Sequence, residues 1–312
     1  MVDLATQAVD AINEVSGRHA GHRAVHAKGM LCAGTFTATP AAATLTTAAH
    51  LQGQTVAVVA RFSNASGNPR IADHARDGHG LAVKMELPDG GRTDIVAVDL
   101  PTFLVRTPED FLAFTRAAKP IGKTDIPGPR FLLFLATHHE AWRAVRAAIT
   151  AKPLESWATC RYNALHAYKW VDAGGRERFV RSTWVPEAGE ATISSGEAKR
   201  RGRDYLQTEL TERLAGATVR FALQIQIADD SDTTDDPTAL WPDERETVTV
   251  GTLELTTTET GREQGGDVLV FDPTRVTAGI ELSDDPILHF RSRAYSVSVE
   301  RRSGISRPPE LS

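Results

Sequence analysis

The amino-acid sequence predicts an α+β domain, in which a mostly antiparallel sheet can close into a barrel with helices packed around it. Many segments after residue 33 are short runs rich in Thr, Val and Phe, which favour β-strands. The turn sequences PDGG at 88–91 and AGG at 173–175 separate neighbouring runs, as in antiparallel hairpins. No repeat or linker-like break in composition occurs, so residues 1–312 are expected to form a single domain.

The first half of the chain predicts a helix, a series of strands and two further helices. A short helix over about residues 3–16 is indicated by apolar residues at helical spacing, namely Leu4, Ala8, Ile12 and Val15. Strand-like runs follow at 33–40, 55–63, 80–87, 92–100 and 102–106. Two helical stretches then interrupt the strands, at 108–119, where a proline and two acids suit a helix start, and at 130–150.

The second half returns to strands. Residues 166–186 have the pattern of a hairpin around AGG, and residues 194–215 predict a helix. Apolar and polar residues alternate over 219–228, as in a half-buried strand, and an acidic loop at 228–244 precedes another strand-like run at 247–259. The barrel core is therefore expected over about 23–302, with a frayed tail over about 303–312.

Composition and charge exclude several classes of protein. Hydrophobic residues make up 41% and charged residues 24%, as in ordinary globular proteins. The net charge of −5 gives no global attraction to nucleic acid or anionic membranes, so any basic site must be local. No run approaches the roughly 20 apolar residues of a membrane span, and the first thirty residues lack a secretory pattern. Only two cysteines occur, without metal-ligand spacing, so a cytoplasmic location is expected.

Two short motifs contain residues suited to redox chemistry. In RSRAYSVSVERR, residues 291–302, a helix would place the Arg291 guanidinium beside the phenol oxygen of Tyr295. A neighbouring positive charge stabilises a phenolate, and a tyrosinate can ligate ferric haem. In RAVHAKG, residues 23–29, His26 lies among small and aliphatic residues. Taken alone, a core tyrosine and a core or surface histidine are the simpler interpretations.

Other candidate motifs are weaker. The sequences GGRTD and GGRER fit hairpin turns rather than a phosphate-binding loop. The stretch ARFSNASG contains serines but lacks the G-x-S-x-G elbow of a nucleophile. The paired histidines of THHE, residues 137–140, fall inside a predicted helix without the HExxH spacing of a zinc site.

The order of the motifs along the chain is more informative than any one of them. Between about Arg23 and Arg302 the chain contains, in sequence, VHAKG, ARFS, ARDGHGLAVKM, DIVAVDLPTFLVRTPEDF, LHAYKWVDAGG, WP with VGTLEL, and GIELSDDPILHFRSRAY. This series resembles the catalase superfamily, segment by segment. Full-size catalases have an N-terminal arm and C-terminal segments that are missing here, so the small catalase-related haem peroxidases are most similar. The resemblance implies a catalase-like antiparallel β-barrel, with haem b buried at the barrel.

The resemblance also implies roles for the residues of a catalytic centre. His26 matches the distal histidine, which would take a proton from the hydroperoxide and return it to the leaving oxygen. Ser63 matches a serine that orients the ring of this histidine. Tyr295 matches the axial ligand of the haem iron, and Arg291 matches the arginine that hydrogen-bonds to it.

Further positions match residues around the haem. His166 and Asp285 match a network behind the arginine partner of the tyrosine. The remaining matches are three arginines that would pair with haem propionates and three apolar residues on the distal side, for which a plain core role is equally plausible: Arg23, Arg61, Arg302, Val25, Phe103 and Phe111.

One position departs from the catalase pattern. Catalases have Asn-Asn-Thr-Pro where this chain has VDLP at 98–101, so Val98 occupies the place of the distal asparagine. Valine cannot hydrogen-bond to peroxide, and a more apolar pocket favours an alkyl hydroperoxide. We therefore expect weak dismutation of hydrogen peroxide. Asp99 could replace the missing amide if the local strand were shifted, and the sequence leaves this open.

The expected function is that of a haem-dependent peroxidase, which reduces hydrogen peroxide and especially organic hydroperoxides with a small electron donor. One alternative is a fatty-acid hydroperoxide isomerase of the allene oxide synthase type; Val25 argues against it, because those enzymes carry a polar residue before the distal histidine. The other alternative is a non-enzymatic haem-binding protein. A homodimer is a weak expectation, nucleic-acid binding is not expected, and the sequence identifies neither the donor nor the hydroperoxide.

Overall fold

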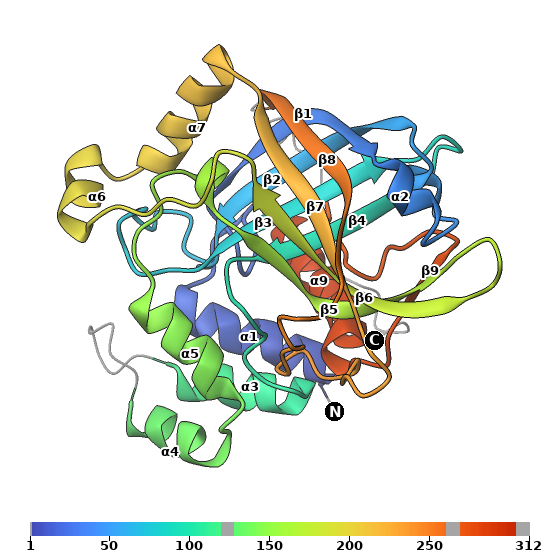
Figure 1. Ribbon diagram of the computed structural model, residues 1–312. Helices are drawn as coiled ribbons and strands as arrows, with labels where there is room; N and C mark the ends of the chain where they lie inside the picture. Colours follow the sequence, from blue (N-terminus) through green and yellow to red (C-terminus); the bar gives the residue numbers. More distant parts are fainter. Residues whose placement is uncertain (1, 120–127, 260–268, 304–312) are drawn as a thin grey trace.

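Nine β-strands dominate the computed structural model, which describes residues 2–119, 128–259 and 269–303 (Figure 1). The strands are β1 (Gly29–Ala38), β2 (Thr55–Asn64), β3 (His79–Glu86), β4 (Arg92–Val98), β5 (Tyr162–Val171), β6 (Glu177–Pro186), β7 (Val219–Ile227), β8 (Thr247–Thr258) and β9 (Ile280–Leu282). The described helices are α1 (Leu4–Ser16), α2 (Pro40–Ala43), α3 (Pro108–Ala117), α4 (Pro129–Thr137), α5 (Ala141–Thr150), α6 (Ser195–Arg201), α7 (Tyr205–Gly216) and α9 (Pro286–Ser303), with short 3₁₀ turns at Ala49–Leu51 and Trp157–Thr159.

The sheet closes into a barrel, which confirms the predicted fold class. Its strand order is β4-β3-β2-β1-β8-β7-β6-β5-β9, and all pairings are antiparallel. A further pairing joins β4 to β5 through Val98 and Asn163, so strands β1 to β8 form a ring and β9 extends β5. Seven of the eight contacts around this ring are ladders of several residue pairs, and the β4–β5 contact completes the ring through one pair.

The two faces of the barrel wall carry different side chains, because successive residues of a strand point to opposite faces. Phe62, Leu81 and Tyr162 are fully buried and belong to the core cluster inside the barrel. Their neighbours Ser63 and Gly80 therefore lie on the outer face, on adjacent strands and in register with each other. This outer face of β2 to β4 is covered by the segment that leads into α9.

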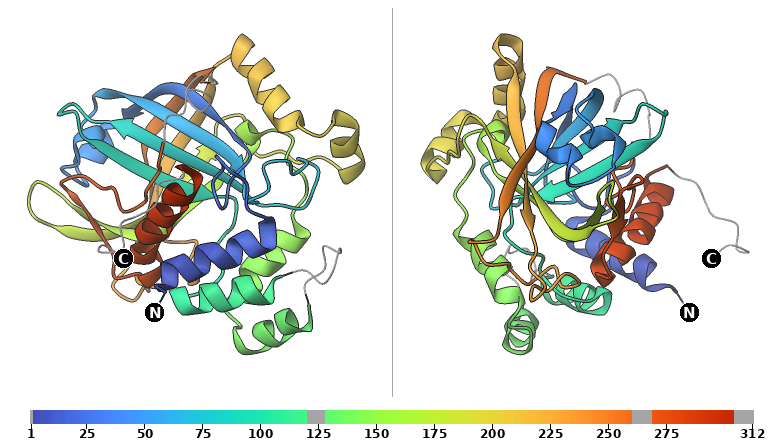
Figure 2. Two further views of the ribbon diagram at one scale, coloured as in Figure 1. Left: turned by 180° about the vertical axis from the view of Figure 1, so that it is seen from behind. Right: turned by 45° about the vertical axis from the view of Figure 1, so that its right-hand side comes forward.

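Helix α9 lies beside the outer barrel wall, with α1 and α3 packed on its other side (Figure 2). It begins at Pro286, a residue suited to the first helical turn because it lacks an N–H that would need a partner there. Its apolar contacts with α1 involve Val297 and Phe290 on α9 with Ala5 and Val9 on α1, and ion pairs of Arg301 with Asp10 and of Arg293 with Asp3 add polar contacts. The three helices thus pack together on the outer side of the barrel (Figure 2).

The strand predicted at 102–106 does not form. Phe103 donates its backbone N–H to the carbonyl of Pro237, and the segment runs as bends between β4 and α3. Pro101 and Pro108 flank it, and a proline has no N–H to donate to a sheet ladder, so a strand between them has little room to pair. The prediction of a strand here was wrong.

Two predicted helices are each divided. The helix at 130–150 is interrupted at His138, whose φ of −123° and ψ of 75° cannot continue a helix, although its backbone N–H still donates to the Phe134 carbonyl at 2.9 Å. The Thr137 hydroxyl donates to the same carbonyl at 3.0 Å and the His138 ring nitrogen lies 3.1 Å from it, so side-chain bonds add to the last turn of α4. The THHE histidines thus lie at a helix break, not inside a helix. The helix at 194–215 is interrupted at Gly202, whose φ of 104° cannot continue a helix.

The ends of the chain agree with the sequence where they are described. Helix α1 begins after Asp3, whose carboxylate accepts a hydrogen bond from the Thr6 N–H at 2.8 Å. The expected frayed tail lies outside the described residues from 304 onward, while Ser303 ends α9. None of the helices within the described ranges has the length and apolar character needed to span a bilayer.

Candidate functional site

His26 has a strained backbone that surrounding groups hold in place. Its φ of 54° makes it the only non-glycine residue with positive φ among those described. A side chain in this left-handed region costs about 1 kcal/mol. The His26 N–H donates to the Ala65 carbonyl at 2.9 Å, and the Arg61 guanidinium donates to the carbonyls of His26 and Ala27 at 2.9 and 3.2 Å. Such strain is typical of functional positions.

The imidazole of His26 is oriented by two strands of the barrel. Its Nδ1 lies 2.9 Å from the Ser63 hydroxyl oxygen on β2. A Cβ atom at Gly80 on β3 would lie 2.9 Å from the His26 Cε1, so only glycine leaves room for the ring here. Within the described residues, Nε2 is left as the ring nitrogen without a hydrogen bond.

The electrostatic surroundings keep His26 neutral. Burial lowers the pKa of its imidazole to about 3, and the positive charges of Arg61 and Arg291 act in the same direction. A neutral imidazole can accept a proton at neutral pH. The Ala24 N–H, two residues before His26, donates to the Ser298 hydroxyl at 3.2 Å, so α9 and the His26 segment are in contact although they are far apart in sequence.

A continuous chain of side-chain bonds ends at Tyr295 on α9. The Arg291 Nε and Nη2 donate to the Tyr295 hydroxyl oxygen at 3.0 and 2.5 Å, as the spacing of four residues predicts for a helix. The Arg291 Nη1 lies 2.9 Å from the Nε2 of His166, which belongs to β5. Burial opposes the charge of Arg291, but the charge and hydrogen bonds of Tyr295 outweigh burial and leave the guanidinium pKa above its usual value.

The bonding partners fix the tautomer of His166. Because a guanidinium can only donate, Nε2 accepts from Arg291, and Nδ1 carries the proton that is donated to Asp285 at 2.6 Å. Burial lowers the pKa of His166, in agreement with a neutral ring. The other carboxylate oxygen of Asp285 accepts from the backbone N–H groups of Ile287 and Leu288, so Asp285 also caps α9.

Of the three arginines expected at haem propionates, two share a hydrogen-bond partner and the third bonds elsewhere. Arg23 and Arg302 both donate to the carbonyl of Leu269, at 3.0 and 3.1 Å, so their guanidinium groups converge. Arg61 is buried, and the hydrogen bonds described above direct it to the backbone beside His26. Leu269 packs on the outer wall of the barrel together with Leu31, Val59, Phe271, Ala82 and Val96.

The apolar residues expected on the distal side lie in two places. Val25 is half-buried and directly precedes His26. Phe103 and Phe111 have ring centroids 6.0 Å apart, and Phe103 lies 6.2 Å from the ring of His166. These aromatic rings therefore pack beside the network that leads to Tyr295.

Val98 lies in the row of outer-face residues that contains Gly80. The register pairs Gly80 with Val98 and Val98 with Asn163, so the Val98 side chain is one strand away from the glycine against which His26 packs. The neighbouring Asp99 is engaged elsewhere: its two oxygens accept from the backbone N–H and the Nδ1 of His79, each at 2.8 Å. Asp99 is thus held by His79.

Sequence reasoning missed several residues of the site. Gly80 could have been noticed, because a glycine inside a strand-like run often marks a close approach. The pairing of His79 with Asp99, 20 positions apart, and the contact of the Ala24 N–H with the Ser298 hydroxyl at 3.2 Å have no local signal. These contacts exist only once the barrel has closed and α9 has docked.

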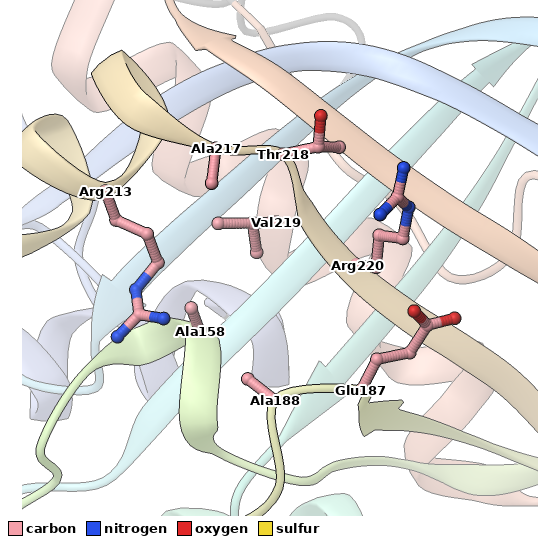
Figure 3. Close-up of a pocket in the computed structure, with 8 residues that line it drawn as sticks. All are labelled: Ala158, Glu187, Ala188, Arg213, Ala217, Thr218, Val219 and Arg220. Carbon is pink, nitrogen blue, oxygen red and sulfur yellow. The ribbon is translucent and has the colours of Figure 1, made fainter.

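A separate surface pocket of about 230 Å³ lies between α7, the start of β7 and the end of β6 (Figure 3). It is lined by Ala158, Glu187, Ala188, Arg213, Ala217, Thr218, Val219 and Arg220. No residue of the predicted catalytic centre lines it. We therefore place the candidate site at His26 and Tyr295.

Comparisons with known proteins agree with this arrangement. A profile of the family described as Catalase matches residues 4–307. A catalase-related peroxidase from Mycolicibacterium paratuberculosis is 45% identical over 302 residues, covering 96% of this chain and 95% of the relative. Another from Synechococcus elongatus is 32% identical over 298 residues, covering 95% and 88%. A solved fungal catalase aligns with a TM-score of 0.83 at 25% identity, covering 95% of this chain but 62% of the longer fungal chain.

Proposed function

Because the chain belongs to the catalase family, we propose that it is a haem-dependent peroxidase. It would reduce hydrogen peroxide, and especially organic hydroperoxides, with a small electron donor, and would dismutate hydrogen peroxide only weakly. The observation that carries this proposal is the chain of bonds from Asp285 through His166 and Arg291 to Tyr295. It holds a phenol oxygen beside a half-buried guanidinium, as a tyrosinate ligand to iron requires.

The residues present fit haem b. The Arg291 guanidinium donates two hydrogen bonds to the oxygen of Tyr295, which would hold the iron. Arg23 and Arg302 converge on one carbonyl and would bind the two propionates, since a guanidinium fork matches a carboxylate. When bound, haem supplies the electrons that break the O–O bond and recovers them from the donor.

His26 would carry the proton through the reaction. Its neutral ring can accept the hydroperoxide proton at Nε2, while Ser63 holds Nδ1 and Gly80 fixes the plane of the ring. The protonated ring would then be a strong acid, because burial and the nearby arginines disfavour the imidazolium. It would return the proton to the leaving oxygen and regain its neutral form.

Val98 supports the preference for organic hydroperoxides. Its side chain adds apolar surface near His26, whereas the asparagine of catalases would donate a hydrogen bond to the bound peroxide. A small, strongly hydrated peroxide loses hydrogen bonds on entering such a site. An alkyl hydroperoxide instead gains contact with the apolar wall.

Spectroscopy and turnover of the haem-loaded protein test the proposal. We expect a high-spin ferric spectrum of the tyrosinate type, whose Soret band shifts after one equivalent of cumene hydroperoxide and returns when an aromatic donor is added. His26→Ala should keep haem but lower peroxidase kcat/KM by about 10²- to 10⁴-fold. The control is His22→Ala, which removes an exposed histidine four residues earlier. Haem that ignores hydroperoxide would contradict the proposal.

Product analysis separates this proposal from an isomerase. A peroxidase consumes two electrons from a donor for each hydroperoxide and forms the alcohol and water. An isomerase rearranges a lipid hydroperoxide without a donor. We therefore expect alcohol that accumulates only when the donor is present; rearranged product formed without donor would overturn the proposal.

The cytoplasmic location remains part of this proposal. Cys32 and Cys160 are both buried free thiols, as suits a reducing compartment. Fractionation of the producing cells, followed by detection of the protein in each fraction, tests the location.

A further inference from the structure

Helices α4 and α5 expose an unusual amount of apolar surface. Leu132 and Leu133 on α4 are 70% and 67% exposed, and Trp142 and Ile149 on α5 are each 58% exposed. We call these four residues the α4–α5 patch. The two helices lie at the edge of the molecule farthest from the barrel, so the patch is open to the surroundings (Figures 1 and 2). Exposed apolar patches often mark an interaction surface.

The patch is carried by an anchored pair of helices. Phe134 on α4 and Ala141 at the start of α5 are buried in one apolar cluster. The Trp142 Nε1–H donates to the Leu135 carbonyl at 2.6 Å, which links the two helices. With this polar group already bonded inside the pair, the tryptophan ring can enter an apolar medium without losing a hydrogen bond.

The segment that carries the patch has a net positive charge. Residues 129–150 contain one acid, Glu140, and three arginines, Arg130, Arg143 and Arg146, all three of which are exposed. Three positive charges and one negative charge give this segment a net charge of +2, in a chain whose net charge is −5. Apolar and basic side chains on the same short helices match the boundary between anionic lipid headgroups and acyl chains.

The same features argue against a second copy of the chain as the occupant. A symmetric dimer through this face would bring the patch of one copy against that of the other. Six arginines would then gather around one interface, against two glutamates. Repulsion among them disfavours such a pairing.

We propose that the α4–α5 patch docks the protein reversibly on anionic lipid bilayers. The inference rests on the proposed function, because a peroxidase acting on organic hydroperoxides would find oxidised acyl chains at such a surface. The apolar cluster beneath the patch also includes Phe103 and Phe111, and Phe103 lies beside His166. Docking would therefore place the helical side of the site, rather than the barrel, toward the bilayer.

Vesicle flotation of the haem-loaded protein tests the proposal. We expect binding to vesicles of 30% phosphatidylglycerol in phosphatidylcholine, little binding to pure phosphatidylcholine, and weaker binding in 0.5 M NaCl. The double variant L132S/L133S and the triple variant R130Q/R143Q/R146Q should each lower the partition coefficient about tenfold or more. Leu240→Ser is the matched control, because Leu240 is 48% exposed in the acidic loop between β7 and β8.

Tryptophan fluorescence gives a second measurement. Trp142 is the one exposed tryptophan of five; the other four are at most 4% exposed. Brominated acyl chains should therefore quench a component of the emission of haem-free protein that is missing in Trp142→Phe. Absence of this component would place the patch outside the bilayer and overturn the proposal.

The outcomes distinguish this proposal from the proposed function. Turnover of soluble cumene hydroperoxide by protein that does not float with anionic vesicles would overturn the docking proposal alone. If the protein floats with vesicles through the patch but does not turn over cumene hydroperoxide, the proposed peroxidase function alone is overturned. Light scattering that shows patch-dependent dimers without vesicle binding would identify a second copy as the occupant and also overturn the docking proposal.

Discussion

At the level of single residues, the geometry around His26 sets the pH range in which a neutral base is available. Ser63 occupies Nδ1, Arg61 holds the backbone carbonyl, and burial together with positive charge lowers the imidazole pKa to about 3. A free histidine would lose its basic form below about pH 6.5. Because its pKa is lowered, the ring of His26 keeps its basic form to much lower pH.

Peroxidase kcat/KM should therefore be nearly constant from pH 7 down to about pH 5, with no acid limb from His26 near pH 6.5. The sign follows from the direction of the shift: a lowered pKa moves protonation of the base to lower pH. Stopped-flow measurement of the reaction with cumene hydroperoxide across this range checks the prediction. An acid limb near pH 6.5 that disappears in His26→Ala would contradict it.

Val98 is the residue at which we expect hydrogen peroxide chemistry to be limited. Val98→Asn should raise oxygen evolution from hydrogen peroxide about tenfold or more. Position 98 lies beside Gly80 on the outer face of the barrel, where the new amide could donate a hydrogen bond to the peroxide. Peroxidase turnover of cumene hydroperoxide should change little. Oxygen-electrode assays make the comparison, with Val98→Ala as an apolar control. Equal oxygen evolution in all three proteins would show that position 98 does not contact the peroxide.

Among these residues, the sequence indicated candidates that lie in recognisable motifs. It did not indicate residues that join the site through contacts between distant segments. His26 and Tyr295 stand in recognisable segments, and the helical spacing of Arg291 predicted its bond to Tyr295. The sequence left open whether Asp99 replaces the missing amide and did not indicate its bonds to His79, because these depend on how the ends of β3 and β4 meet. Local residue spacing contains no information on how these two strand ends are placed in space.

At the level of elements, α9 combines a helix cap with the network at the site. One oxygen of Asp285 caps the first turn, and the other accepts from His166, which in turn accepts from Arg291. The start of the helix and the position of Tyr295 are therefore coupled through one carboxylate. The local cap signal in the sequence, an aspartate before a proline, is visible, but its second partner comes from β5.

Asp285→Asn should lower the free energy of unfolding by about 3 kcal/mol. The amide oxygen can still cap α9, but the amide nitrogen would donate to the Nδ1 of His166, so that Nε2 would carry the proton and face the Arg291 donors. Urea unfolding measures the loss. Asp3→Asn is the control, because Asp3 caps α1 in an exposed position; it should cost less than about 1 kcal/mol. Equal losses in the two variants would argue against the coupling.

The divided helices show why element boundaries were harder to predict than element types. The apolar periodicity of 130–150 continues across the break, so periodicity alone predicts one helix. The break lies where His138 leaves the helical conformation, with a φ of −123° and a ψ of 75°, while its side chain and that of Thr137 bond to the carbonyl of Phe134. Apolar spacing contains no signal for such a change in the backbone.

At the level of the whole molecule, the contact between β4 and β5 that closes the barrel lies beside the site and is the shortest in the ring; we call it the seam. Strands β4 and β5 share the single pairing of Val98 with Asn163, reinforced by the Asn163 amide, which donates to the Leu100 carbonyl at 3.0 Å and accepts from Thr183 at 3.2 Å. The sequence predicted the eight strands of the ring in order, together with a strand at 102–106 that does not form, and it missed β9. It could not predict this contact, because Asn163 is 63 positions from Leu100, to which its amide donates, and one residue pair leaves no pattern in the sequence.

Asn163→Ala should lower the free energy of unfolding by about 1–2 kcal/mol, because it leaves the Leu100 carbonyl and the Thr183 hydroxyl without their partner. Hydrogen exchange should accelerate in β4 and β5 more than in β1 and β2. Thr183→Val, which removes only one of the two hydrogen bonds, should have a smaller effect in the same strands. Uniform acceleration over all strands would show that the seam does not open independently.

The left-handed backbone at position 26 has a consequence for laboratory evolution of this protein. Once the imidazole is dispensable, glycine is the residue that best accepts a φ of 54°, with an advantage over alanine of about 1 kcal/mol. In a library randomised at this position, selection for heat resistance alone should therefore enrich glycine over alanine, whereas selection for survival under peroxide should retain histidine. Sequencing both selected pools would show glycine enriched at codon 26 in one pool and histidine retained in the other.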